Sequence, residues 1–303
     1  MSSLSCYRGR FAPSPTGPLH FGSLVAAVGS YLDARAAGGE WLLRMEDVDE
    51  PRSMAGAADA ILRDLESLGF AWDGEVAYQS RRTAHYRAAF ERLRLDGSVF
   101  ACACTRREVA DSTLGPDAAP RYPGTCRNGL PPGREARAWR LKVGPGMVCF
   151  DDALQGRVCQ DLAAEVGDFV VLRADGYFAY QLAVVVDDAE QGVTHVVRGA
   201  DLLDSTPRQI CLQRRLDLSQ PNYLHLPAVV NAAGEKLSKQ TRARPVDAIH
   251  PQASLVAALE FLGQLPPADL MGADLEDLWR WAIMHWNRSH LPRCRIAQAP
   301  AEF

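Results

Sequence analysis

Prolines and glycines crowd one short stretch near the N-terminus, RFAPSPTGPLHFGS at residues 10–23. Pro13 and Pro15 fix φ and drive the residues before them into extended conformations. A Gly-Pro pair then marks a turn, and beyond it apolar residues recur at helical spacing. The stretch therefore predicts a stiff loop that leads into a helix N-terminus, where free backbone N–H groups and the helix dipole favour an anion such as phosphate.

The elements that follow alternate between strands and helices. The patterns predict strands at 7–11 and 41–45, and helices at 21–37, 57–68 and 83–95. After a hairpin over 168–183 that turns at Asp175-Gly176, the sequences LAVVVDD and THVVRG predict further buried strands. Helices are expected at 206–215, where Thr206 caps and Pro207 opens the helix, and at 254–262 and 275–286. This alternation predicts an α/β fold whose parallel sheet carries its sites at the carboxyl ends of the strands.

The composition is that of an ordinary globular chain, with 47% apolar and 23% charged residues among 303. No apolar run reaches the roughly 18 residues of a membrane helix, and the N-terminus lacks an apolar signal core, so we expect a cytoplasmic protein. In a reducing compartment the eight cysteines are expected in the core or on a metal rather than in disulfides. The net charge of −4 means that a nucleic-acid partner would need a local basic surface.

A second short stretch, KLSKQ at 236–240, follows a turn-like Ala-Gly pair. Two lysines three residues apart on a glycine-flanked loop can close over a triphosphate and neutralise the charge that develops as pyrophosphate leaves. Taken alone the pattern is weak, because short lysine pairs on loops are usually solvated charge. Its significance comes from its combination with the proline-rich loop.

Together, PSPTGPLHFGS and KLSKQ resemble the HIGH and KMSKS signatures of class I aminoacyl-tRNA synthetases. The segments LRMEDVDEPRS, AVVVDD and THVVRGADLLDSTPRQ are similar to the glutamyl branch over most of the catalytic domain. The resemblance implies a Rossmann-like catalytic core that binds ATP, with Mg²⁺, through His20, Gly22, Lys236, Ser238 and Lys239. Ser23 stands where the signature has its second histidine, so that position departs from the family pattern.

The same resemblance implies a glutamate pocket built on two arginines, one acidic residue and one tyrosine, namely Arg10, Arg198, Glu46 and Tyr180. Glutamate carries two carboxylates and one ammonium, and each arginine can hold a carboxylate through two parallel hydrogen bonds. Glu46 follows a buried strand, where it can receive the ammonium, and Tyr180 adds a hydroxyl donor. The pocket is also expected to include the loop residues Phe11, Ala12, Pro13 and Ser14. Outside this context, such side chains would equally suit surface ion pairs and a core-edge hydroxyl.

Cysteines gather after residue 100, where the sequence loses its periodicity and indicates an insertion. The spacing of Cys102, Cys104 and Cys126 suggests a structural zinc site, although three thiolates leave a fourth position open. The YPGTC element resembles the branch of glutamyl-synthetase-like enzymes in which a tyrosine oxygen fills that position, which implicates Tyr122; water or an empty position is the alternative. The remaining cysteines lack paired spacing and are expected in the core or as incidental thiols: Cys6, Cys149, Cys159, Cys211 and Cys294.

The expected organisation is a first half of the catalytic domain at 1–100, a zinc-bearing insertion at 101–175, a second half with the KLSKQ loop at 176–245 and a short helical C-terminal region at 246–303. That last region is too short for the anticodon-binding domain of a full-length glutamyl-tRNA synthetase. The HFGS, YFAYQLAVVVDD and YPGTC elements also resemble the truncated glutamyl-queuosine tRNA(Asp) synthetase family.

The resemblance to that truncated family implies activation of glutamate with ATP and transfer onto queuosine at the wobble position of tRNA(Asp). The alternatives are a truncated glutamyl-tRNA synthetase that charges a 3′ end and a non-catalytic, zinc-stabilised tRNA-binding module. We expect activation to proceed without tRNA in a monomeric protein, although the sequence fixes no oligomeric state. The basic surface for RNA is expected from arginines near the cleft: Arg127, Arg134, Arg137, Arg208, Arg242 and Arg244.

Overall fold

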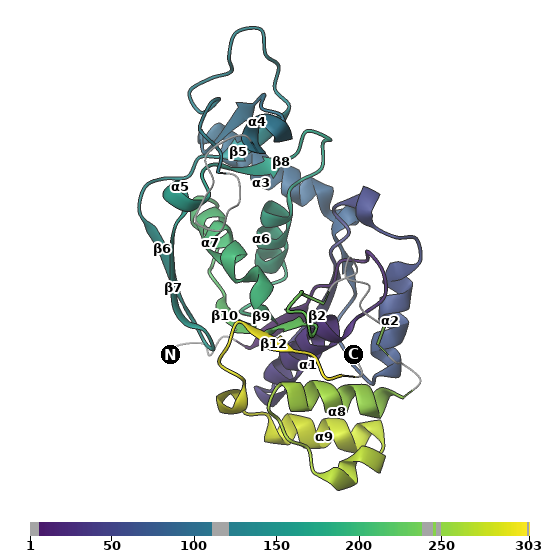
Figure 1. Ribbon diagram of the computed structural model, residues 1–303. Coiled ribbons are helices and arrows are strands. Elements are labelled where there is room, and N and C mark those ends of the chain that lie inside the picture. The colour runs from purple at the N-terminus through teal and green to yellow at the C-terminus, as the bar shows by residue number, and fades with distance from the viewer. Residues whose placement is uncertain (1–5, 111–120, 238–244, 247–249, 302) are drawn as a thin grey trace.

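The computed structural model describes residues 6–110, 121–237, 245–246, 250–301 and 303. Figure 1 shows a central body, an insertion at one end and a pair of C-terminal helices at the other. The α-helices are α1 Phe21–Ala36, α2 Ala57–Ser67, α3 Thr83–Leu95, α4 Arg106–Ala110, α5 Leu162–Glu165, α6 Tyr180–Glu190, α7 Thr206–Arg215, α8 Pro251–Phe261 and α9 Leu275–His285. The strands are β1 Arg8–Phe11, β2 Glu40–Met45, β3 Ala77–Tyr78, β4 Val99–Cys102, β5 Ala138–Leu141, β6 Met147–Asp152, β7 Gly156–Asp161, β8 Phe169–Leu172, β9 His195–Gly199, β10 Asn222–Leu226, β11 Ala228–Val230 and β12 Ile296–Gln298.

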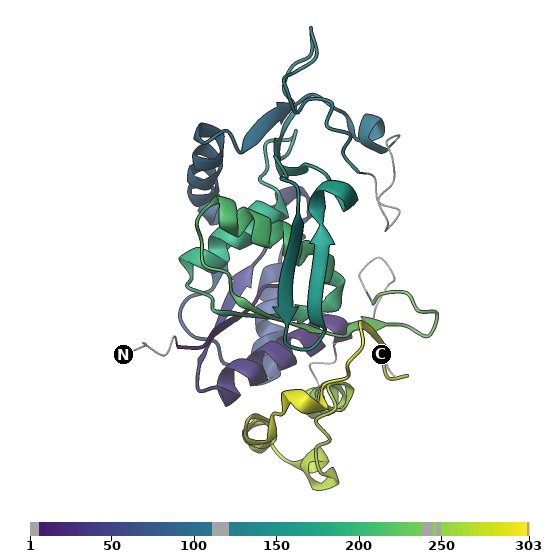
Figure 2. The same cartoon turned by 90° about the vertical axis from the view of Figure 1, so that its left-hand side faces the viewer.

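Parallel strands form the centre of the molecule. β1 pairs with β2, β2 with β3, and β9 with β10, all in parallel. β9 lies beside β1, where the Thr194 N–H donates to the Arg8 carbonyl over 2.9 Å. β10 also pairs in parallel with β6, and β6 and β7 form a long antiparallel hairpin along one side of the body (Figure 2). The α/β core with parallel strands, predicted from the alternation of elements, is confirmed.

α1 begins directly after the proline-rich loop, as the sequence predicts. His20 caps the helix, since its Nδ1 accepts the Ser23 N–H over 3.2 Å. Most residues of α1 are buried, and Gly29 allows the helix to approach β10, because a Cβ there would lie 2.5 Å from Leu226 Cδ1. The loop before the helix is fixed by backbone hydrogen bonds to the segment that follows β2. The loop and the helix N-terminus are therefore held rigidly at one edge of the parallel strands.

The chain between α3 and α6 builds a second sheet, which is antiparallel and has the strand order β4-β5-β8. In Figure 1 it lies at the end of the molecule opposite to α8 and α9. Its apolar residues join a core shared with α3, α6 and α7. Next to it, Phe100, Cys102, Tyr122 and Cys126 belong to a small separate buried cluster. This sheet and this cluster follow the change of character that the sequence shows near residue 100, whereas β6 and β7 of the same segment join the central strand β10.

The prediction of a strand at LAVVVDD, residues 182–188, is wrong, because these residues form the middle of α6. The predicted hairpin is also shorter than expected: the chain turns at Gly176, with φ of 87°, and Leu172 bridges to Phe178, but a helix starts at Tyr180. Every residue from 182 to 188 is buried. Such a helix shows no polar face, and its short apolar run has the pattern of a buried strand.

Two cysteines predicted to be isolated thiols are bonded to each other. Cys149 and Cys159 are direct partners across the β6–β7 hairpin and form a disulfide. This corrects the expectation that the cysteines lie only in the core or on a metal. The pairing depends on the register of a hairpin that the sequence pattern did not indicate, so the spacing of the two residues alone could not reveal it.

The C-terminal segment packs against α1, and the predicted helices in it are confirmed as α8 and α9. β12 adds to β11 in parallel, and the Phe303 ring stacks on Phe21 at the start of α1, with 4.2 Å between ring centroids. The buried Asp33 of α1 accepts hydrogen bonds from Trp286 Nε1 over 3.0 Å and from Arg288 over 2.6 and 2.8 Å. The end of the chain is thereby tied to the helix that follows the proline-rich loop. Among the described residues, we find no helix with the length and apolar character that crossing a membrane requires.

Candidate active site

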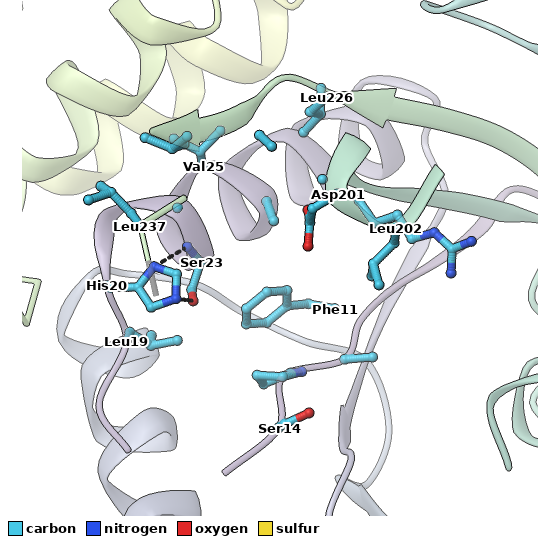
Figure 3. A pocket seen from close by; sticks show the side chains of 18 of the residues that line it. Phe11, Ser14, Leu19, His20, Ser23, Val25, Asp201, Leu202, Leu226 and Leu237 are labelled. Carbon is cyan, nitrogen blue, oxygen red and sulfur yellow. Dashed lines mark hydrogen bonds between the residues drawn. The ribbon is translucent and has the colours of Figure 1, made fainter. Parts of the chain in front are cut away.

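A cavity of about 720 Å³ opens where β1, β9 and β10 end and α1 begins (Figure 3). Every predicted binding residue that the structure describes lines it: Arg10, Phe11, Ala12, Pro13, Ser14, His20, Gly22, Glu46, Tyr180, Arg198 and Lys236. Ser238 and Lys239 lie outside the described residues. The fold thus brings the proline-rich loop, the predicted amino-acid pocket and the first lysine of KLSKQ to one place.

One side of this cavity is formed by the N-terminus of α1. The His20 ring lies 3.2 Å from both the backbone nitrogen and the hydroxyl of Ser23, as Figure 3 shows. Gly22 is equally close, since a Cβ at this position would lie 3.2 Å from the His20 ring. Lys236 donates to the Asp201 carboxylate over 2.5 Å, and that carboxylate points into the cavity. The serine that replaces the second signature histidine therefore orients the first, beside a helix N-terminus suited to phosphate.

Arg198, at the end of β9, is 5% exposed and is held on two of its three nitrogens. Its Nε donates to His225 Nε2 over 3.0 Å, and its Nη2 donates to Thr206 Oγ1 over 2.9 Å and to Gln209 Oε1 over 2.8 Å. Thr206, predicted to cap α7, is instead its first residue. The third nitrogen, Nη1, is buried without a hydrogen-bond partner among the described residues. Because an unpaired donor on a buried cation is costly, Nη1 marks a position for an anionic acceptor.

Arg10 belongs to a buried cluster of charges. Its Nε and Nη2 donate to the Asp188 carboxylate over 3.2 and 3.4 Å. Arg44 donates to Asp188 over 2.8 Å and to Glu46 over 3.3 Å. Burial opposes ionisation of Asp188, but Arg10 and Arg44 outweigh it and lower the pKa of this carboxyl. Burial raises the pKa of Glu46, although Arg44 and Arg10 oppose that effect. Arg10 and Glu46 are thus fixed at the cavity wall by a shared set of ion pairs.

Tyr180, the first residue of α6, lines the same cavity. Burial, and then the nearby Glu46 carboxylate, raise the pKa of its phenol to about 12. At neutral pH the side chain therefore keeps its proton. Its hydroxyl can donate a hydrogen bond to a group in the cavity.

The charged residues behind the pocket, above all Arg44 and Asp188, were not predicted from the sequence. The side chain of Arg44 is fully buried within the apolar run WLLRM, and Asp188 ends the apolar run of α6. Ionisable side chains are rarely buried unless they are paired. A charge inside or at the end of an apolar run is therefore a signal for a buried ion pair, and it was present in both segments.

Cys102, Cys104, Cys126 and Tyr122 converge in the insertion, as predicted. The three sulfurs lie within 4.8 Å of one another, and those of Cys104 and Cys126 are 3.7 Å apart. Tyr122 Oη lies 3.5 Å from the Cys102 sulfur and 3.9 Å from that of Cys104. A tetrahedral zinc with Zn–S of about 2.3 Å and Zn–O of about 2.0 Å needs S–S separations of about 3.8 Å and S–O separations of about 3.5 Å. The Cys104–Cys126 and Cys102–Tyr122 separations match these values, so the cluster is suited to hold a tetrahedral metal.

Arg140 of β5 supports this cluster from the side. Its Nε donates to the Cys102 sulfur over 3.3 Å, and its guanidinium carbon lies 3.9 Å from the centre of the Tyr122 ring. Burial opposes ionisation of Cys102, but its hydrogen bonds with Tyr122 and Arg140 outweigh burial and lower the pKa of this thiol. Burial, a hydrogen bond with Cys126 and the proximity of Cys102 raise the pKa of Cys104 to about 11. A metal that binds here must therefore displace protons.

Some of the arginines expected to form a basic surface have structural partners. Arg127 pairs with a buried aspartate, and Arg134 pairs with a glutamate of α4. Both hold parts of the insertion together. Arg137 is exposed, whereas Arg242 and Arg244 lie outside the described residues.

Comparison with known proteins agrees with this geometry. The family model of class I tRNA synthetases (E and Q), catalytic domain, matches residues 7–256. The chain is 63% identical over 297 residues to the glutamyl-Q tRNA(Asp) synthetase of Aromatoleum aromaticum, covering 98% of this chain and 94% of that relative. It is 60% identical over 299 residues to the protein of the same name in Dechloromonas aromatica, covering 98% and 99% of the two chains.

Among solved structures, the glutamate-tRNA synthetase of Elizabethkingia anophelis superposes with a TM-score of 0.80 at 23% identity, over 98% of this chain and 68% of that one. This likeness shows a shared fold. The identities over nearly the full chain are far higher for the glutamyl-Q proteins. This chain belongs to the glutamyl-Q tRNA(Asp) synthetase family of the class I tRNA synthetases.

Proposed function

We propose that this protein activates L-glutamate with ATP and transfers the glutamyl group onto queuosine in tRNA(Asp). Family membership makes it an ATP-dependent ligase. One observation carries the proposal: in a chain 63% identical to a glutamyl-Q tRNA(Asp) synthetase, two buried arginines and a half-buried glutamate share a cavity with a helix N-terminus. These are the groups that a dicarboxylic amino acid and a nucleotide phosphate require.

Glutamate binds at the end of the cavity where the charges gather. Arg198 offers Nη1, which has no partner among the residues that the structure describes, to one carboxylate. Arg10 offers Nη1 to the other, because its Nε and Nη2 are engaged by Asp188. Glu46 accepts the ammonium, and the Tyr180 hydroxyl adds a hydrogen bond. The segment Phe11 to Ser14 lines the space between these groups. Two cationic donors and one carboxylate match the charges of glutamate, whereas glutamine would leave one arginine without an anion.

ATP binds at the start of α1. The helix N-terminus around Gly22 and the side chains of His20 and Lys236 face its phosphates. Ser238 and Lys239 are proposed to complete this site from the KLSKQ loop, with Mg²⁺ bound to the phosphates. An oxygen of the α-carboxylate of glutamate attacks the α-phosphorus of ATP. The new P–O bond gives glutamyl-adenylate, and pyrophosphate leaves. Positioning and charge stabilisation carry this step, so no side chain has to act as a nucleophile.

The cluster of Cys102, Cys104, Cys126 and Tyr122 holds one zinc ion in a structural role. Its fit to tetrahedral geometry and its place in the insertion support this role, because zinc would tie β4 to the segment that carries Tyr122. The residues that line the catalytic cavity include none of these ligands. We propose that the protein acts as a monomer.

Transfer follows when a hydroxyl of the cyclopentene-diol ring of queuosine attacks the glutamyl carbon and AMP leaves. The test uses labelled glutamate, ATP and tRNA(Asp) with or without queuosine. We expect label only on the queuosine-bearing tRNA, and we expect it to survive enzymatic removal of the 3′-terminal adenosine. Glutamate-dependent ATP–pyrophosphate exchange should proceed without any tRNA.

Each alternative result has a defined meaning. Label that is lost with the terminal adenosine would replace this proposal with a 3′-charging glutamyl-tRNA synthetase. Equal labelling of both tRNA forms would contradict the queuosine acceptor. Absence of exchange without tRNA would contradict tRNA-independent activation, and absence of exchange under all conditions would refute the ligase activity.

A further inference from the structure

The orientation of Arg198 depends on an acceptor that is itself a titratable ring. His225, on the neighbouring strand β10, presents Nε2 to the Arg198 Nε–H at 3.0 Å. Thr206 and Gln209 hold Nη2, so the guanidinium plane is fixed, and in the described part of the chain Nη1 has no hydrogen-bond partner. Nε2 can accept this bond only if it carries no proton. The way Arg198 faces the cavity therefore depends on which nitrogen of His225 is protonated.

Asp152 determines that protonation. It is buried at the end of β6, and its Oδ2 lies 2.6 Å from Nδ1 of His225. An ionised carboxylate only accepts hydrogen bonds, so Nδ1 must carry the proton. The pKa of the Asp152 carboxyl is low: burial opposes ionisation, but the bond from His225 and the N–H groups of Gln155 and Leu154 outweigh it. The carboxylate is thus held by the loop that follows β6.

The imidazole itself is kept neutral. Burial is the largest effect and lowers the pKa of His225 to about 4; the bond to Asp152 opposes this, and the charge of Arg198 adds to it. A protonated ring would turn an N–H toward the guanidinium and lose the acceptor. The neutral Nδ1–H form is therefore the one in which all three side chains are satisfied.

We propose that Asp152 and His225 are positioning residues for substrate binding: Asp152 fixes the Nδ1–H tautomer of His225, and this tautomer aims Arg198 at a carboxylate of the amino acid. The inference rests on the proposed function, because it takes Arg198 to bind glutamate. It assigns a role to two residues that do not line the cavity. With Arg198 they form a chain of three hydrogen-bonded side chains across β6, β10 and β9.

The decisive variant is Asp152→Asn. Its Oδ1 can still accept the backbone N–H groups of Leu154 and Gln155, which lie 3.0 and 2.9 Å from Oδ1 in the native protein. Its Nδ2 would donate to Nδ1 of His225, which forces the proton onto Nε2, where it opposes the Arg198 Nε–H. We expect the KM for glutamate in ATP–pyrophosphate exchange to rise about ten-fold or more, with the KM for ATP within about two-fold of the native value.

Asp151→Asn is the matched control. It removes the same charge from the adjacent residue of β6, whose exposed carboxylate makes one long contact of 3.5 Å to Arg157. Both KM values should stay at the native level in this variant. A general loss of folded protein would lower the turnover of Asp152→Asn without separating the two KM values, so the separation reports positioning.

The tautomer is measured independently of activity from the ¹⁵N shifts of the histidine rings, beginning with the native protein. Native His225 should be neutral with its proton on Nδ1 at pH 7, and in Asp152→Asn the proton should be on Nε2. A native Nε2–H tautomer or a charged ring would overturn the inference even if the variant does not fold. The inference would also be overturned if the native enzyme is active and a folded Asp152→Asn variant has an unchanged KM for glutamate. The proposed function would then stand. A native protein without glutamate-dependent exchange would refute the proposed function, and with it the role of Arg198.

Discussion

The buried His225 makes the stability of this protein depend on pH, and the dependence can be calculated. The pKa of the ring falls from 6.5 to about 4 on folding, with burial as the main cause. Between these two values the unfolded chain binds a proton and the native protein does not. The contribution of His225 to the free energy of unfolding is therefore fully present above pH 6.5. It decreases as the pH falls and is lost below about pH 4.

The size of this effect follows from linkage. The full shift corresponds to about 3 kcal/mol, and the part that appears between pH 7 and pH 5 is about 2 kcal/mol. This is a large fraction of the 5–15 kcal/mol that is typical of a domain. Replacing His225 with glutamine removes the titration and offers an amide oxygen near the position of Nε2, so the variant should lack this loss whatever its absolute stability is.

The assay is urea unfolding of the native protein and of His225→Gln at pH 7 and pH 5. The stability lost between these pH values should be about 2 kcal/mol larger in the native protein than in the variant. The comparison cancels titrating groups that do not touch His225, such as His195, whose pKa is lowered first by burial. Equal losses of stability in the two proteins would show that His225 titrates normally. The conclusion that its buried ring stays neutral would then be wrong.

Four further predictions concern the proposed sites. Lys239→Ala should lower the rate of glutamate-dependent ATP–pyrophosphate exchange about 10²-fold or more, the scale of one lost transition-state donor; a native rate would refute the role of Lys239. Arg198→Gln should raise the KM for glutamate about 10²-fold while the KM for ATP stays within about two-fold, and equal changes in both would argue against a carboxylate contact. Protein purified without chelator should contain one equivalent of zinc, and Cys104→Ser should lose it, whereas Cys211→Ser should keep it; well-folded native protein without metal would contradict the site. Phe303→Ala should lower the melting temperature, because the Phe303 ring stacks on Phe21, and an unchanged melting temperature would show that the chain end adds nothing to α1.

The parts of the fold that the sequence predicted well are those with local signals. The loop into α1 carries its prolines, its capping histidine and its helical periodicity within one short stretch, and β1 and β2 are short apolar runs bounded by turn residues. The cysteine spacing likewise anticipated the cluster in the insertion, because Cys102 and Cys104 stand at and just after the end of one strand. For the loop and the two strands, the residues that decide the conformation are neighbours in the chain, and for the cluster the motif of Cys102 and Cys104 is local.

The failures share a different cause. α6 looks like a strand because packing on all sides removes the polar face by which a helix is identified. The Cys149–Cys159 pair depends on the register of β6 and β7, and the contact between Asp152 and His225 joins residues more than seventy positions apart. No window of sequence contains such information, because tertiary packing decides it.

The two arginines of the pocket differ in a way that only the structure reveals. Arg10 is neutralised by a direct ion pair with Asp188, whereas the hydrogen bonds that hold Arg198 in the described part of the chain all go to uncharged groups: His225, Thr206 and Gln209. A buried cation without a bonded anion is unfavourable. Removal of the anionic partner from a buried ion pair costs several kcal/mol for this reason. Keeping His225 neutral preserves that imbalance, which a substrate carboxylate removes when it reaches Nη1. The bonded side chains in the described part of the chain therefore balance the charge of Arg10 but not that of Arg198, so we expect the contact with Arg198 to contribute more to the selection of an acidic amino acid.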